Sequence, residues 1–439
     1  MIRSMIEQGC HVGFFGLGRS NLSLLRTLHL ENCSITLRSD GNIDPNILPG
    51  SRIMCGALAC EDVSEDILFL SPSVKRERFK NSGGVILSSD YELFLSECRK
   101  PIFAVTGSDG KSSTARILTM LLSESGIRAR EVGNIGEPMF ASLRHDADIY
   151  VAELSSYMLS AAQPMAEVAC LTSLTPNHID WHKSYENYKK TKISLLKSSK
   201  KYVISDENAD VKGAYAIISL TRSFVELRQI YDAELYLTVE DGQIMKNGKA
   251  LIPLNRIQRR EGHNLKNLMT AVAMAEGYYS EEALIRVTGS FSGLPHRCEK
   301  LIGRGGIDCY DSSIDTSPAR TATTLRSLGR EVVIILGGRG KGLDYRLMLP
   351  EVEEYVRLAV LVGENKNEIY RDIGDRVPCV LAKDFASAVT LGLENAKEVG
   401  ALLLSPASAS YDLFPSYEIR GETFKKLVNK GLGNEADLS

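Results

Sequence analysis

The sequence predicts an α/β fold made of successive domains, and three observations support it. Short apolar runs alternate along the chain with longer stretches of helical character, which is typical of parallel, doubly wound sheets. Glycine-containing turns follow several apolar runs, where a strand passes into a helix. The chain has 439 residues, and one domain commonly holds roughly 100–200 residues. We therefore expect three domains, over residues 1–99, 100–298 and 299–439.

The first domain is expected to form a Rossmann-like parallel sheet. A helix is expected at Leu22–Leu30, after a turn that contains glycine. Short apolar runs predict strands at His11–Phe15, Ser34–Leu37, Asp66–Leu70 and Val85–Leu87.

Pro101 marks the start of the second domain, in which a strand and a glycine turn precede a helix from about Lys111. A β-rich, irregular stretch runs from Tyr202 to Pro253, and a helix follows at Asn264–Gly277. The segment Phe291–Glu299 has the character of a domain boundary. Apolar runs predict buried strands at Ile102–Val105, Ile149–Leu154 and Val168–Leu174.

The third domain alternates in the same way and is expected to be Rossmann-like again. Helices are expected at Phe385–Ala396 and Gly421–Val428. The predicted strands are Val332–Leu336, Leu358–Val362 and Ala401–Leu404.

The composition argues against several classes of protein. Apolar residues make up 44% and charged residues 24% of the chain, as in ordinary globular proteins. A net charge of -3 gives no basic footprint for nucleic acid or an anionic membrane surface. Nine scattered cysteines without a CxxC pair favour reduced thiols, and no apolar run approaches the ~20 residues of a membrane span. We expect a cytoplasmic protein, with a monomer as the default.

The strongest chemical signal is IFAVTGSDGKSS, where a strand ends, a glycine turn follows and a helix begins. Gly107 and Gly110 permit tight backbone curvature, and N–H groups at a helix start suit an anion. Lys111 is placed to reach the outer phosphates of a nucleotide, and the Ser112 hydroxyl to bind Mg²⁺. A standard Walker A motif has glycine where Val105 stands, so a plain strand–turn–helix corner is the alternative. We expect a P-loop ATPase-like central domain with ATP at Gly107, Ser108, Asp109, Gly110, Lys111, Ser112 and Ser113.

The turn GFFGLGRSN after the first strand is a weaker signal. Gly16 and Gly18 lie between a strand and a helix, but Asn21 stands where a dinucleotide-binding fold has glycine or alanine. A loop around the diphosphate of another ligand is therefore favoured over an NAD site, and a simple turn is the plain alternative.

Other polar residues at strand ends suit a divalent cation. Glu153 closes the apolar run DIYVAE, and a buried carboxylate there is costly without a partner such as Mg²⁺. In LTPNHIDWH, His178 and His182 have a spacing found in zinc sites on helices, but the glutamate of an HExxH motif is missing. Zinc is therefore disfavoured, and an exposed loop position is the alternative for His182.

Several later segments have the character of ligand contacts. In GHNLKN, Asn264 and Asn267 are placed either to pair with an adenine edge or to cap a helix. Arg297 in LPHR suits either a nucleotide phosphate or a linker salt bridge. The loops LGGRGKG, which carries Lys341, and LLLSPASASYDL follow strands at the edge where parallel sheets bind ligands, and each is otherwise a simple turn.

Together these segments resemble the Mur ligase family, which builds the peptide stem of the bacterial cell-wall precursor. TGSDGKSS is similar to the family's TGTNGKTT, and the later motifs follow in the family's order: NIGEP, ELSSYML, LTPNHIDWH, GHNLKN, GLPHRCE, LGGRGKGLDY and LLSPASASYDLFPSYEIRG. The resemblance covers nearly the whole chain. NIGEP, ELSSY and the last two motifs are most similar to the family member that adds D-glutamate, and the sequence has no DNPR motif of the diaminopimelate- or lysine-adding member.

The resemblance implies an ATP-dependent ligase that adds D-glutamate to UDP-N-acetylmuramoyl-L-alanine through an acyl-phosphate, in peptidoglycan precursor synthesis. The three domains are then expected to bind the UDP moiety, ATP and the amino acid. Lys111, Lys192 and His178 are expected to be catalytic, and Ser112, Glu153 and Lys192 to hold two Mg²⁺ ions.

The same resemblance implies the remaining ligand contacts. Asn264, Asn267 and Arg297 are expected to hold the nucleotide. The expected substrate contacts are Gly18, Arg19, Ser20, Ser71, Pro72, Asn134, Ser155, His178, Thr316, Lys341, Ser410 and Tyr411.

Lys192, in the run YKKTK, matches the lysine that the family carbamylates. A free lysine has a pKa of about 10.4 and, as a cation, does not bind Mg²⁺. A carbamate is an anion with two oxygens, which hard cations prefer. Without the resemblance, a solvated lysine on a basic helix is the plain alternative.

One segment departs from the family pattern. Where the family has NDSKATN, this chain has DSSIDTS, Asp311–Ser317. Aligned without gaps to Thr316, Ser312 replaces the family's aspartate and Ile314 its lysine, whereas a shift of one residue restores Asp311 and displaces Thr316. A nucleotide contact and an acceptor-side contact are therefore open, and the lost cation predicts weaker affinity for D-glutamate.

The implied reaction has two steps. The substrate carboxylate attacks the γ-phosphate, and the amine of the amino acid then attacks the acyl carbonyl with loss of phosphate. Lys111 and Mg²⁺ would spread the charge on the transferring group, and three domains imply a closure that excludes water. The rival functions are a folylpolyglutamate-type ligase, an NAD-dependent oxidoreductase and a nucleotide-binding relative without catalysis.

Overall fold

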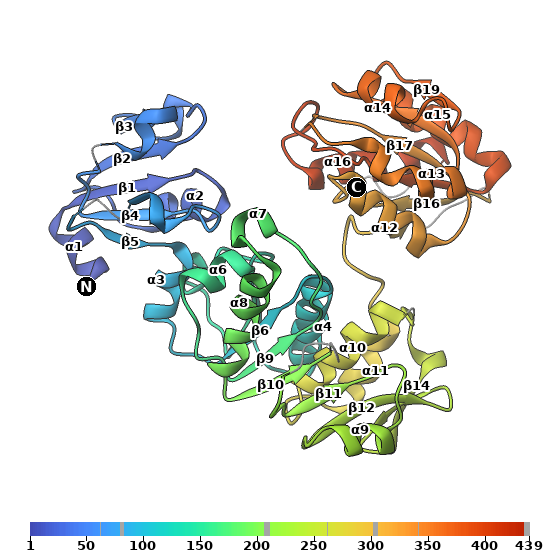
Figure 1. Ribbon diagram of the computed structural model, residues 1–439, viewed down its shortest axis with the longest axis horizontal. Helices are drawn as coiled ribbons and strands as arrows, with labels where there is room; N and C mark the ends of the chain where they lie inside the picture. Colours follow the sequence, from blue (N-terminus) through green and yellow to red (C-terminus); the bar gives the residue numbers. More distant parts are fainter. Residues whose placement is uncertain are drawn as a thin grey trace. The chain divides into compact units, whose positions relative to one another are not determined.

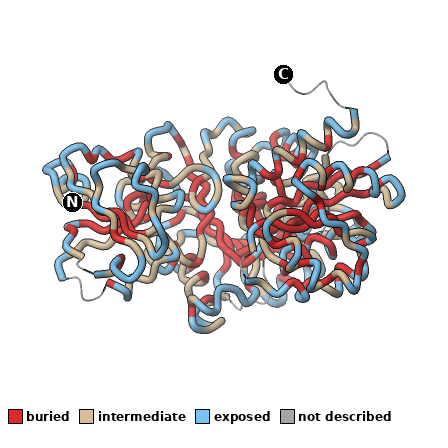
Figure 2. The backbone as a smooth tube through the Cα atoms, turned by 90° about the horizontal axis from the view of Figure 1, so that it is seen from above, coloured by how far each residue is buried: buried red, intermediate tan, exposed pale blue. Residues whose placement is uncertain are grey.

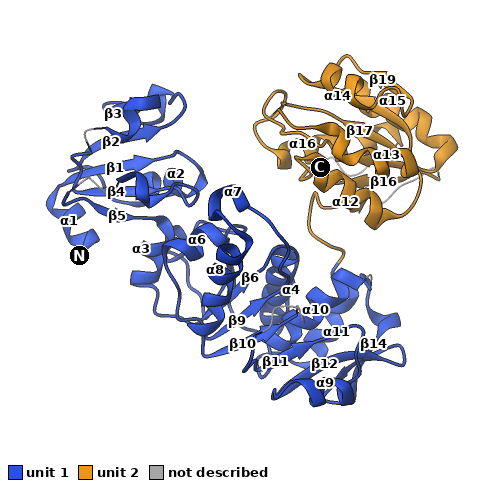
Figure 3. Cartoon of the chain, viewed as in Figure 1, with its two compact units in different colours: residues 1–291 blue, residues 292–439 orange. Residues whose placement is uncertain are grey.

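The structure is a computed structural model that describes residues 1–61, 63–79, 83–205, 211–260, 262–301, 306–340 and 342–433. Over these residues the chain forms three sheets, with helices between most of the strands (Figure 1). It divides into two compact units, Met1–Phe291 with two sheets and Ser292–Ser439 with the third (Figure 3). The predicted α/β fold class with parallel sheets is confirmed.

The first region contains a parallel sheet with the order β3-β2-β1-β4-β5 over the described residues. Its elements are α1 (Ile2–Gln8), β1 (His11–Phe15), α2 (Arg19–Thr27), β2 (Ser34–Ser39), β3 (Arg52–Cys55), β4 (Ile67–Leu70), β5 (Ile86–Ser88) and α3 (Asp90–Glu97). An apolar cluster covers each face, and the rings of Phe14 and Phe69 stack on adjacent strands with centroids 5.3 Å apart. The strand order changes direction at β1 and β4, where parallel sheets commonly bind ligands.

The second region contains the largest sheet, with the order β14-β13-β12-β11-β10-β9-β6-β8-β7 over the described residues. Its elements are β6 (Ile102–Thr106), α4 (Lys111–Glu124), β7 (Ala129–Gly133), α5 (Met139–Ser142), β8 (Ile149–Glu153), α6 (Ser156–Ala161), β9 (Val168–Leu171), α7 (Ile179–His182), α8 (Tyr185–Lys197), β10 (Lys201–Ile204), β11 (Ala216–Ile218), α9 (Phe224–Ile230), β12 (Leu235–Glu240), β13 (Gln243–Lys246), β14 (Lys249–Pro253), α10 (Gly262–Met274) and α11 (Glu281–Ser290). Strands β12, β13 and β14 are antiparallel, which accounts for the β-rich stretch predicted there.

Strand β6 lies inside this sheet, between β8 and β9. Its side chains alternate between two cores, as the period of a strand requires. Phe103 and Val105 join the cluster under α4, α10 and α11, and Ile102 and Ala104 join the cluster under α6 and α8. Because both faces are buried, the end of β6 is held firmly, and the loop that follows it has a fixed base.

The third region contains a sheet with the order β15-β16-β20-β17-β18-β19 over the described residues, parallel except for the pair β15–β16. Its elements are β15 (Glu299–Leu301), β16 (Asp308–Asp311), α12 (Pro318–Leu328), β17 (Val332–Leu336), α13 (Leu349–Tyr355), β18 (Val356–Leu361), α14 (Lys366–Ile373), β19 (Cys379–Leu381), α15 (Phe385–Val399), β20 (Ala401–Leu404) and α16 (Tyr417–Gly431). Figure 2 shows buried residues in the interior of each compact unit and exposed residues on many outer turns.

Several predicted bounds differ from the observed ones. The helix predicted at Leu22–Leu30 is Arg19–Thr27, because Gly18 caps it in extended backbone. The helix predicted at Gly421–Val428 is Tyr417–Gly431, because Ser416 caps a start that lies four residues earlier. The strand after β6 in space is Val168–Leu171 rather than Val168–Leu174, because the next two residues bond to the turn that follows β6. Within the described residues, no helix combines the length and apolarity needed to cross a membrane.

Candidate active site

The turn between β6 and α4 requires its two glycines. Gly107 has φ 149°, and a Cβ there would lie 1.9 Å from Thr172 Oγ1. Gly110 has φ 83°, and a Cβ there would lie 2.4 Å from Asn267 Oδ1. The backbone of the turn therefore approaches both the end of β9 and helix α10 more closely than any other residue type permits.

Hydrogen bonds fix the rest of this turn. The Ser108 hydroxyl donates to the Thr175 carbonyl oxygen at 2.9 Å, and the Asp109 backbone N–H donates to Ser173 Oγ at 2.8 Å. Lys111 Nζ donates to the Ser108 carbonyl oxygen at 2.7 Å, so the ammonium group folds back over the turn. The expected ATP-binding residues thus form one continuous turn, and Ser112 and Ser113 follow, both largely buried, in the first turn of α4. Backbone N–H groups and one cation at the start of a helix form a site of the kind that suits phosphate.

Glu153 ends β8 beside this turn, since it pairs in register with Val105 of β6. The carboxylate is 1% exposed. Asn134 Nδ2 donates to Glu153 Oε1 at 2.9 Å, whereas Glu153 Oε2 is buried without a hydrogen-bond partner among the described residues. A buried carboxylate oxygen without a partner is costly, so the residues present fit a divalent cation at this oxygen.

Lys192 lies on α8 with its ammonium nitrogen against the base of the same turn. Nζ donates to the Gly107 carbonyl oxygen at 2.8 Å and to Thr106 Oγ1 at 3.3 Å. The residue is 2% exposed, so the solvated-lysine alternative is wrong. Burial, and to a smaller extent the positive charge of Lys111, lowers the pKa of Lys192 to about 6. Lys192 is therefore largely neutral at pH 7.

His178 and His182 differ in their surroundings. His178 is exposed, has φ 53°, and places Nδ1 2.9 Å from the Tyr157 hydroxyl. His182 is 6% exposed and stacks with Tyr157, which contradicts the alternative of an exposed loop histidine. Burial lowers the pKa of His182. Within the described part of the chain, the two histidines do not belong to a group of three metal-ligand side chains.

Three further expected ligand contacts of this unit are Asn264, Asn267 and Ser155. Asn264 and Asn267 lie inside α10 and are buried, so the helix-cap alternative is wrong for both. Asn267 packs on Gly110, because a Cβ added at Gly110 would lie 2.4 Å from Asn267 Oδ1. The Ser155 hydroxyl accepts a hydrogen bond from the Met158 N–H at 3.2 Å and caps α6, which leaves its donor for a ligand.

The turn after β1 is held by Asn21 together with the close approach of Gly16, which has φ 79° and where a Cβ would lie 2.9 Å from Ser71 Oγ. Asn21 is fully buried, and its Nδ2 donates to the carbonyl oxygens of Phe15, Gly16 and Phe69 at 2.8–3.2 Å. The Ser71 hydroxyl also donates to the Gly16 carbonyl oxygen, at 2.7 Å. Asn21 thus joins the ends of β1 and β4, which explains why glycine is absent from this position.

The other expected substrate contacts of the first region lie close to that turn. Gly18 caps α2, and Arg19 and Ser20 begin this helix. Ser71 and Pro72 follow β4 and line a hollow. The hollow is also lined by Tyr91, Tyr157, Met158, Ala161 and Trp181. Because Tyr157 also contacts His178, this hollow adjoins the proposed catalytic histidine.

In the second compact unit, expected contacts gather where neighbouring strands end. Thr316 follows β16 and Ser410 follows β20, and these strands are parallel neighbours. Ser410 is 2% exposed and Tyr411 is 64% exposed. The loop after β17 joins them, because the Arg339 N–H donates to the Ala409 carbonyl oxygen at 2.8 Å.

Lys341 lies outside the described residues, one residue beyond the described part of the loop after β17. Arg297 belongs to this second unit as well, in the segment that precedes β15.

Two contributors to the site were missed in the sequence. The Tyr188 hydroxyl lies 2.9 Å from Ser108 Oγ, and Lys192 Nζ lies 4.9 Å from the centre of the Tyr188 ring. Thr106 contacts Lys192 through its hydroxyl. The spacing of Tyr188 and Lys192, four residues apart on one helix, places both on one face and was the available signal.

Comparison with known proteins identifies similar chains. Residues 105–275 match the family of the Mur ligase middle domain. A UDP-N-acetylmuramoylalanine--D-glutamate ligase of Clostridium novyi (strain NT) is 31% identical over 441 residues, which cover 95% of this chain and 96% of that protein. A protein of the same name from Clostridium botulinum (strain 657 / Type Ba4) is 30% identical, over 83% of this chain and 82% of that protein.

Solved structures share the fold. UDP-N-acetylmuramate-alanine ligase MurC from Thermotoga maritima has a TM-score of 0.58 at 13% identity, over 96% of this chain and 99% of that chain. E. coli FolC in complex with ADP has a TM-score of 0.55 at 14% identity, over 78% of this chain and 93% of that chain. These two likenesses concern the fold alone.

Proposed function

The chain belongs to the Mur ligase family and is an ATP-dependent, amide-forming ligase of peptidoglycan precursor synthesis, and we propose that it joins D-glutamate to UDP-N-acetylmuramoyl-L-alanine. The two Clostridium relatives that carry this activity in their names support the choice of substrates. We also propose that the chain acts as a monomer in the cytoplasm, where ATP is available and where its nine cysteines remain reduced.

The observation that carries the proposal is the group of ionisable side chains around the turn after β6. Lys111 folds over the turn, Lys192 touches its base, and Glu153 ends the adjacent strand with one oxygen unpartnered among the described residues. Phosphoryl transfer needs mainly positioning and charge stabilisation. In the proposed reaction, Lys111 and the N–H groups of the turn hold the γ-phosphate while the substrate carboxylate attacks it and ADP leaves.

Mg²⁺ fits the same group of residues. The proposed ligands are the unpartnered oxygen of Glu153, the Ser112 hydroxyl and a carbamate on Lys192. When bound, Mg²⁺ neutralises charge on the phosphoryl oxygens. Asn134 holds the other oxygen of Glu153 and so fixes the orientation of the carboxylate.

The carbamate proposal is supported by the burial of Lys192. A neutral amine can attack CO₂ to give a carbamate and one released proton, whereas an ammonium group has no free electron pair. Because the pKa of Lys192 is about 6, the amine is available for this addition at neutral pH. The resulting anion would replace a buried neutral group at the base of the turn.

The proposed carboxylate substrate is held by the first unit. Its diphosphate is assigned to the turn with Gly18, Arg19 and Ser20, and its sugar to residues near Ser71 and His178. Ser71 and Pro72 line the aromatic hollow that also contains Tyr157, so this hollow adjoins the proposed sugar subsite.

The proposed acceptor contacts are Thr316, Lys341, Ser410 and Tyr411. D-Glutamate is a dianion, so it needs a cation and several donors, which a lysine, hydroxyls and backbone N–H groups supply. With both carboxylates held, the L-enantiomer directs its amine away from the acyl carbonyl, a misplacement that costs about 100-fold or more in rate.

The test is phosphate release from ATP and Mg²⁺ by the purified full-length chain. UDP-N-acetylmuramoyl-L-alanine is offered with D-glutamate, L-glutamate, L-alanine, L-lysine or diaminopimelate, and a folate with L-glutamate is offered in parallel. We expect release only when the UDP substrate and D-glutamate are both present, with a product whose mass equals the two joined minus water.

Each other outcome has a defined meaning. Equal use of L-glutamate or L-alanine would defeat the acceptor assignment while leaving the ligase chemistry. Release with the folate alone would replace the substrate assignment by that of a folylpolyglutamate-type ligase. Lys341→Ala is expected to raise the KM for D-glutamate and to leave the KM for the UDP substrate unchanged.

A further inference from the structure

The guanidinium group of Arg420 is buried among the loops of the second compact unit. Arg420 lies near the start of α16 and is 2% exposed. Burial lowers the pKa of Arg420 to about 10, and the negative charge of Asp412 opposes this shift. The side chain therefore remains a cation at pH 7. A buried cation is costly unless hydrogen bonds satisfy it, so the partners of Arg420 show what it holds together.

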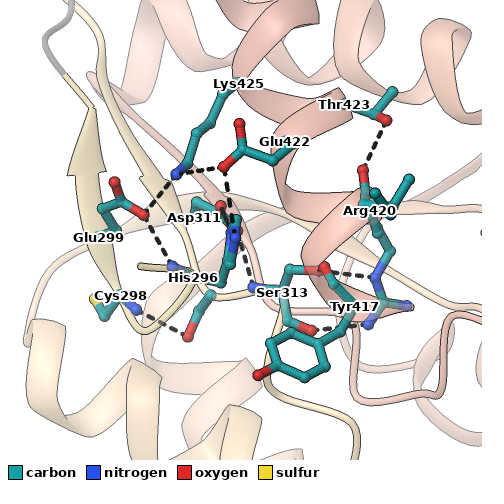
Figure 4. A network of polar contacts seen from close by, with 12 residues as sticks. His296, Cys298, Glu299, Asp311, Ser313, Tyr417, Arg420, Glu422, Thr423 and Lys425 are labelled. Atoms are coloured by element: carbon teal, nitrogen blue, oxygen red, sulfur yellow. Dashed lines mark hydrogen bonds and ion pairs between the residues drawn. The ribbon is translucent and has the colours of Figure 1, made fainter. Parts of the chain in front are cut away.

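Hydrogen bonds join Arg420 to the loops after β16 and β20. Nε donates to Ser313 Oγ at 3.0 Å and Nη2 donates to the Ser313 carbonyl oxygen at 2.8 Å, in the loop after β16. Nη1 and Nη2 both donate to the Ser408 carbonyl oxygen at 3.1 Å, in the loop after β20. Figure 4 shows the guanidinium group directed at Ser313. The planar fork of an arginine side chain allows it to bond to both loops at once.

The loop after β17 packs against the same guanidinium group. Gly338 has φ 148°, and a Cβ there would lie 2.2 Å from the Ala409 carbonyl oxygen and 3.2 Å from Arg420 Nη1. The Gly338 N–H donates to Asn365 Oδ1 at 2.9 Å, and Asn365 Nδ2 donates to Ser408 Oγ at 2.8 Å. The loops after β17 and β20 therefore meet beside Arg420.

The loop after β20 has a backbone conformation that its contacts must enforce. Ala407 has φ 55° and is 0% exposed. A residue with a Cβ adopts this conformation only where the surrounding structure holds it. The hydrogen bonds from Arg420 and Asn365 to the next residue, Ser408, supply such contacts.

Each of these loops carries a proposed contact to the acceptor amino acid. Thr316 lies three residues beyond Ser313, and Ser410 lies two residues beyond Ser408. The loop after β17 continues to Lys341. Because the chain between each proposed contact and its anchored neighbour is so short, a shift of Ser313 or Ser408 would displace the groups proposed to bind the acceptor.

The residue after Arg420 brings α16 close to the end of β16. A Cβ at Gly421 would lie 2.1 Å from His296 Nδ1 and 2.7 Å from Asp311 Oδ2. The His296 ring and the Asp311 carboxylate are themselves in contact, with Nδ1 and Oδ2 2.7 Å apart (Figure 4). Any larger residue at this position would push the helix away, so Gly421 allows Arg420 to reach both loops.

The side chains of His296, Glu299 and Asp311 also form a group of possible metal ligands. His296 and Asp311 already contact each other, and Lys425 Nζ of α16 lies 2.8 Å from Glu299 Oε2. Protein contacts thus satisfy the group, and it anchors α16 to the sheet.

We propose that Arg420 is a positioning residue for the acceptor amino acid. By bonding to the loops after β16 and β20 and packing on the loop after β17, it sets the spacing of the groups that bind the two carboxylates of D-glutamate. Arg420 acts through these loops and does not itself touch the substrate. This inference rests on the proposed function, because it takes the acceptor and its contacts from that proposal.

The test is the steady-state rate of phosphate release by the full-length chain, with each of the three substrates varied in turn. Arg420→Lys keeps the positive charge but loses the planar fork that bonds to both loops. We expect the KM for D-glutamate to rise about tenfold, because its contacts are misplaced, and the KM values for ATP and for the UDP substrate to stay unchanged. The ratio of kcat/KM for D-glutamate to that for L-glutamate should also fall, because looser loops hold the two carboxylates less firmly.

Ser313→Ala keeps the test available if Arg420→Lys does not fold. It removes the hydroxyl that accepts from Arg420 Nε and leaves the carbonyl oxygen that accepts from Nη2. We expect a smaller rise in the KM for D-glutamate, about threefold, because one hydrogen bond of several is lost.

Arg330→Lys is the matched control. Arg330 Nη1 donates to Asp308 Oδ2 at 2.8 Å and Nη2 donates to the Gly400 carbonyl oxygen at 3.3 Å. This arginine therefore joins the beginnings of β16 and β20, whereas Arg420 joins the loops at their ends. Arg330→Lys is expected to lower the melting temperature without changing the KM for D-glutamate or the selectivity between the enantiomers.

Two results would overturn the positioning role. One is a rise in the KM for D-glutamate in Arg330→Lys as large as that in Arg420→Lys, which would mean general loosening of the unit. The other is an unchanged KM and an unchanged selectivity in a folded Arg420→Lys. Failure of the proposed function is distinguishable, because it appears already in the wild-type chain as absent release with D-glutamate. If the wild type uses another amino acid, the KM for that amino acid is compared instead, and if it uses none, both proposals fall.

Discussion

The turn after β1 and the turn after β6 share one plan, a strand followed by glycines and a helix, but they differ in what fills them. In the first, the Asn21 side chain donates to three carbonyl oxygens, and the Ser71 hydroxyl is a second donor to one of them, that of Gly16. In the second, glycines bring the backbone against its neighbours, and Lys111 and Lys192 bond to the turn. The first turn is held by neutral side chains, and the second brings together the ionisable groups that the proposed phosphoryl transfer would use.

Among the replacements that test the difference between the two turns, that of Lys111 is expected to have the largest effect on turnover. Lys111→Ala should lower turnover by about 1,000-fold or more, because the lysine neutralises charge on the transferring phosphoryl group. Its side chain is only half-buried, so the melting temperature should change little. Phosphate release measures the turnover, and thermal unfolding followed by circular dichroism measures the melting temperature. As a control, Arg19→Ala in the first turn should leave the affinity for ATP intact, and near-normal ATP consumption by Lys111→Ala would defeat the assignment of the second turn.

Replacing Lys192 is expected to have the next largest effect. Lys192→Ala should lose about 100-fold in rate, as when a metal ligand or its support is removed. A short carboxylate such as acetate or formate should restore part of the rate by supplying anionic oxygens. Lys190→Ala on the same helix is the matched control, since Lys190 is exposed. Unimpaired activity of Lys192→Ala would exclude a role for this lysine in the reaction.

A pair of glycine replacements compares the two turns directly. Gly110→Ala places a methyl group 2.4 Å from Asn267 Oδ1 at φ 83°, and it should weaken binding of an ATP analogue about tenfold, or 1.4 kcal/mol. Gly18→Ala meets only Ser71 Oγ, at 3.8 Å, and should cost about 0.5 kcal/mol of stability. Titration calorimetry and thermal unfolding measure the two quantities. Equal effects of the two variants on analogue binding would contradict the difference between the turns.

The smallest expected effect is the dependence of the free energy of unfolding on pH that buried Lys192 causes. Lys192 is neutral in the folded protein above a pKa of about 6, whereas in the unfolded chain it keeps its proton up to about pH 10.4. Between these values the unfolded state binds more protons, so raising the pH stabilises the fold. In CO₂-free buffer, Lys192→Met should be more stable than wild type by about 2 kcal/mol or more at pH 7. The difference in free energy of unfolding, measured with urea, should shrink toward pH 10, and a difference that grows with pH would show that the buried amine is not neutral.

The strands were predicted well where burial on both faces leaves a continuous apolar run. The predicted His11–Phe15, Val332–Leu336 and Ala401–Leu404 agree with β1, β17 and β20. Strands with polar or short sequences were not predicted individually, such as β7 (Ala129–Gly133) and β16 (Asp308–Asp311). Their pairing with neighbours, rather than their own composition, makes them strands.

The candidate site was predictable to the extent that it follows one local motif. TGSDGKSS indicated the turn with Lys111 because strand, glycines, lysine and hydroxyl are adjacent in the chain. The burial of Lys192 was not predictable from YKKTK, because it depends on how α8 packs against the turn. The link between His296 and Asp311 likewise depends on residues 15 apart and on the space beside Gly421. Contacts between distant segments therefore set the limit of prediction here.

The central claim is that the turn after β6 transfers the γ-phosphate of ATP to the substrate carboxylate. The most direct measurement uses UDP-N-acetylmuramoyl-L-alanine with both carboxylate oxygens replaced by ¹⁸O, followed by mass spectrometry of the released phosphate. Attack of the carboxylate on the γ-phosphate moves one labelled oxygen into the phosphate and leaves the other in the amide. We expect one ¹⁸O per phosphate when D-glutamate is present, and phosphate without ¹⁸O would show that ATP is hydrolysed without an acyl-phosphate and would contradict the account.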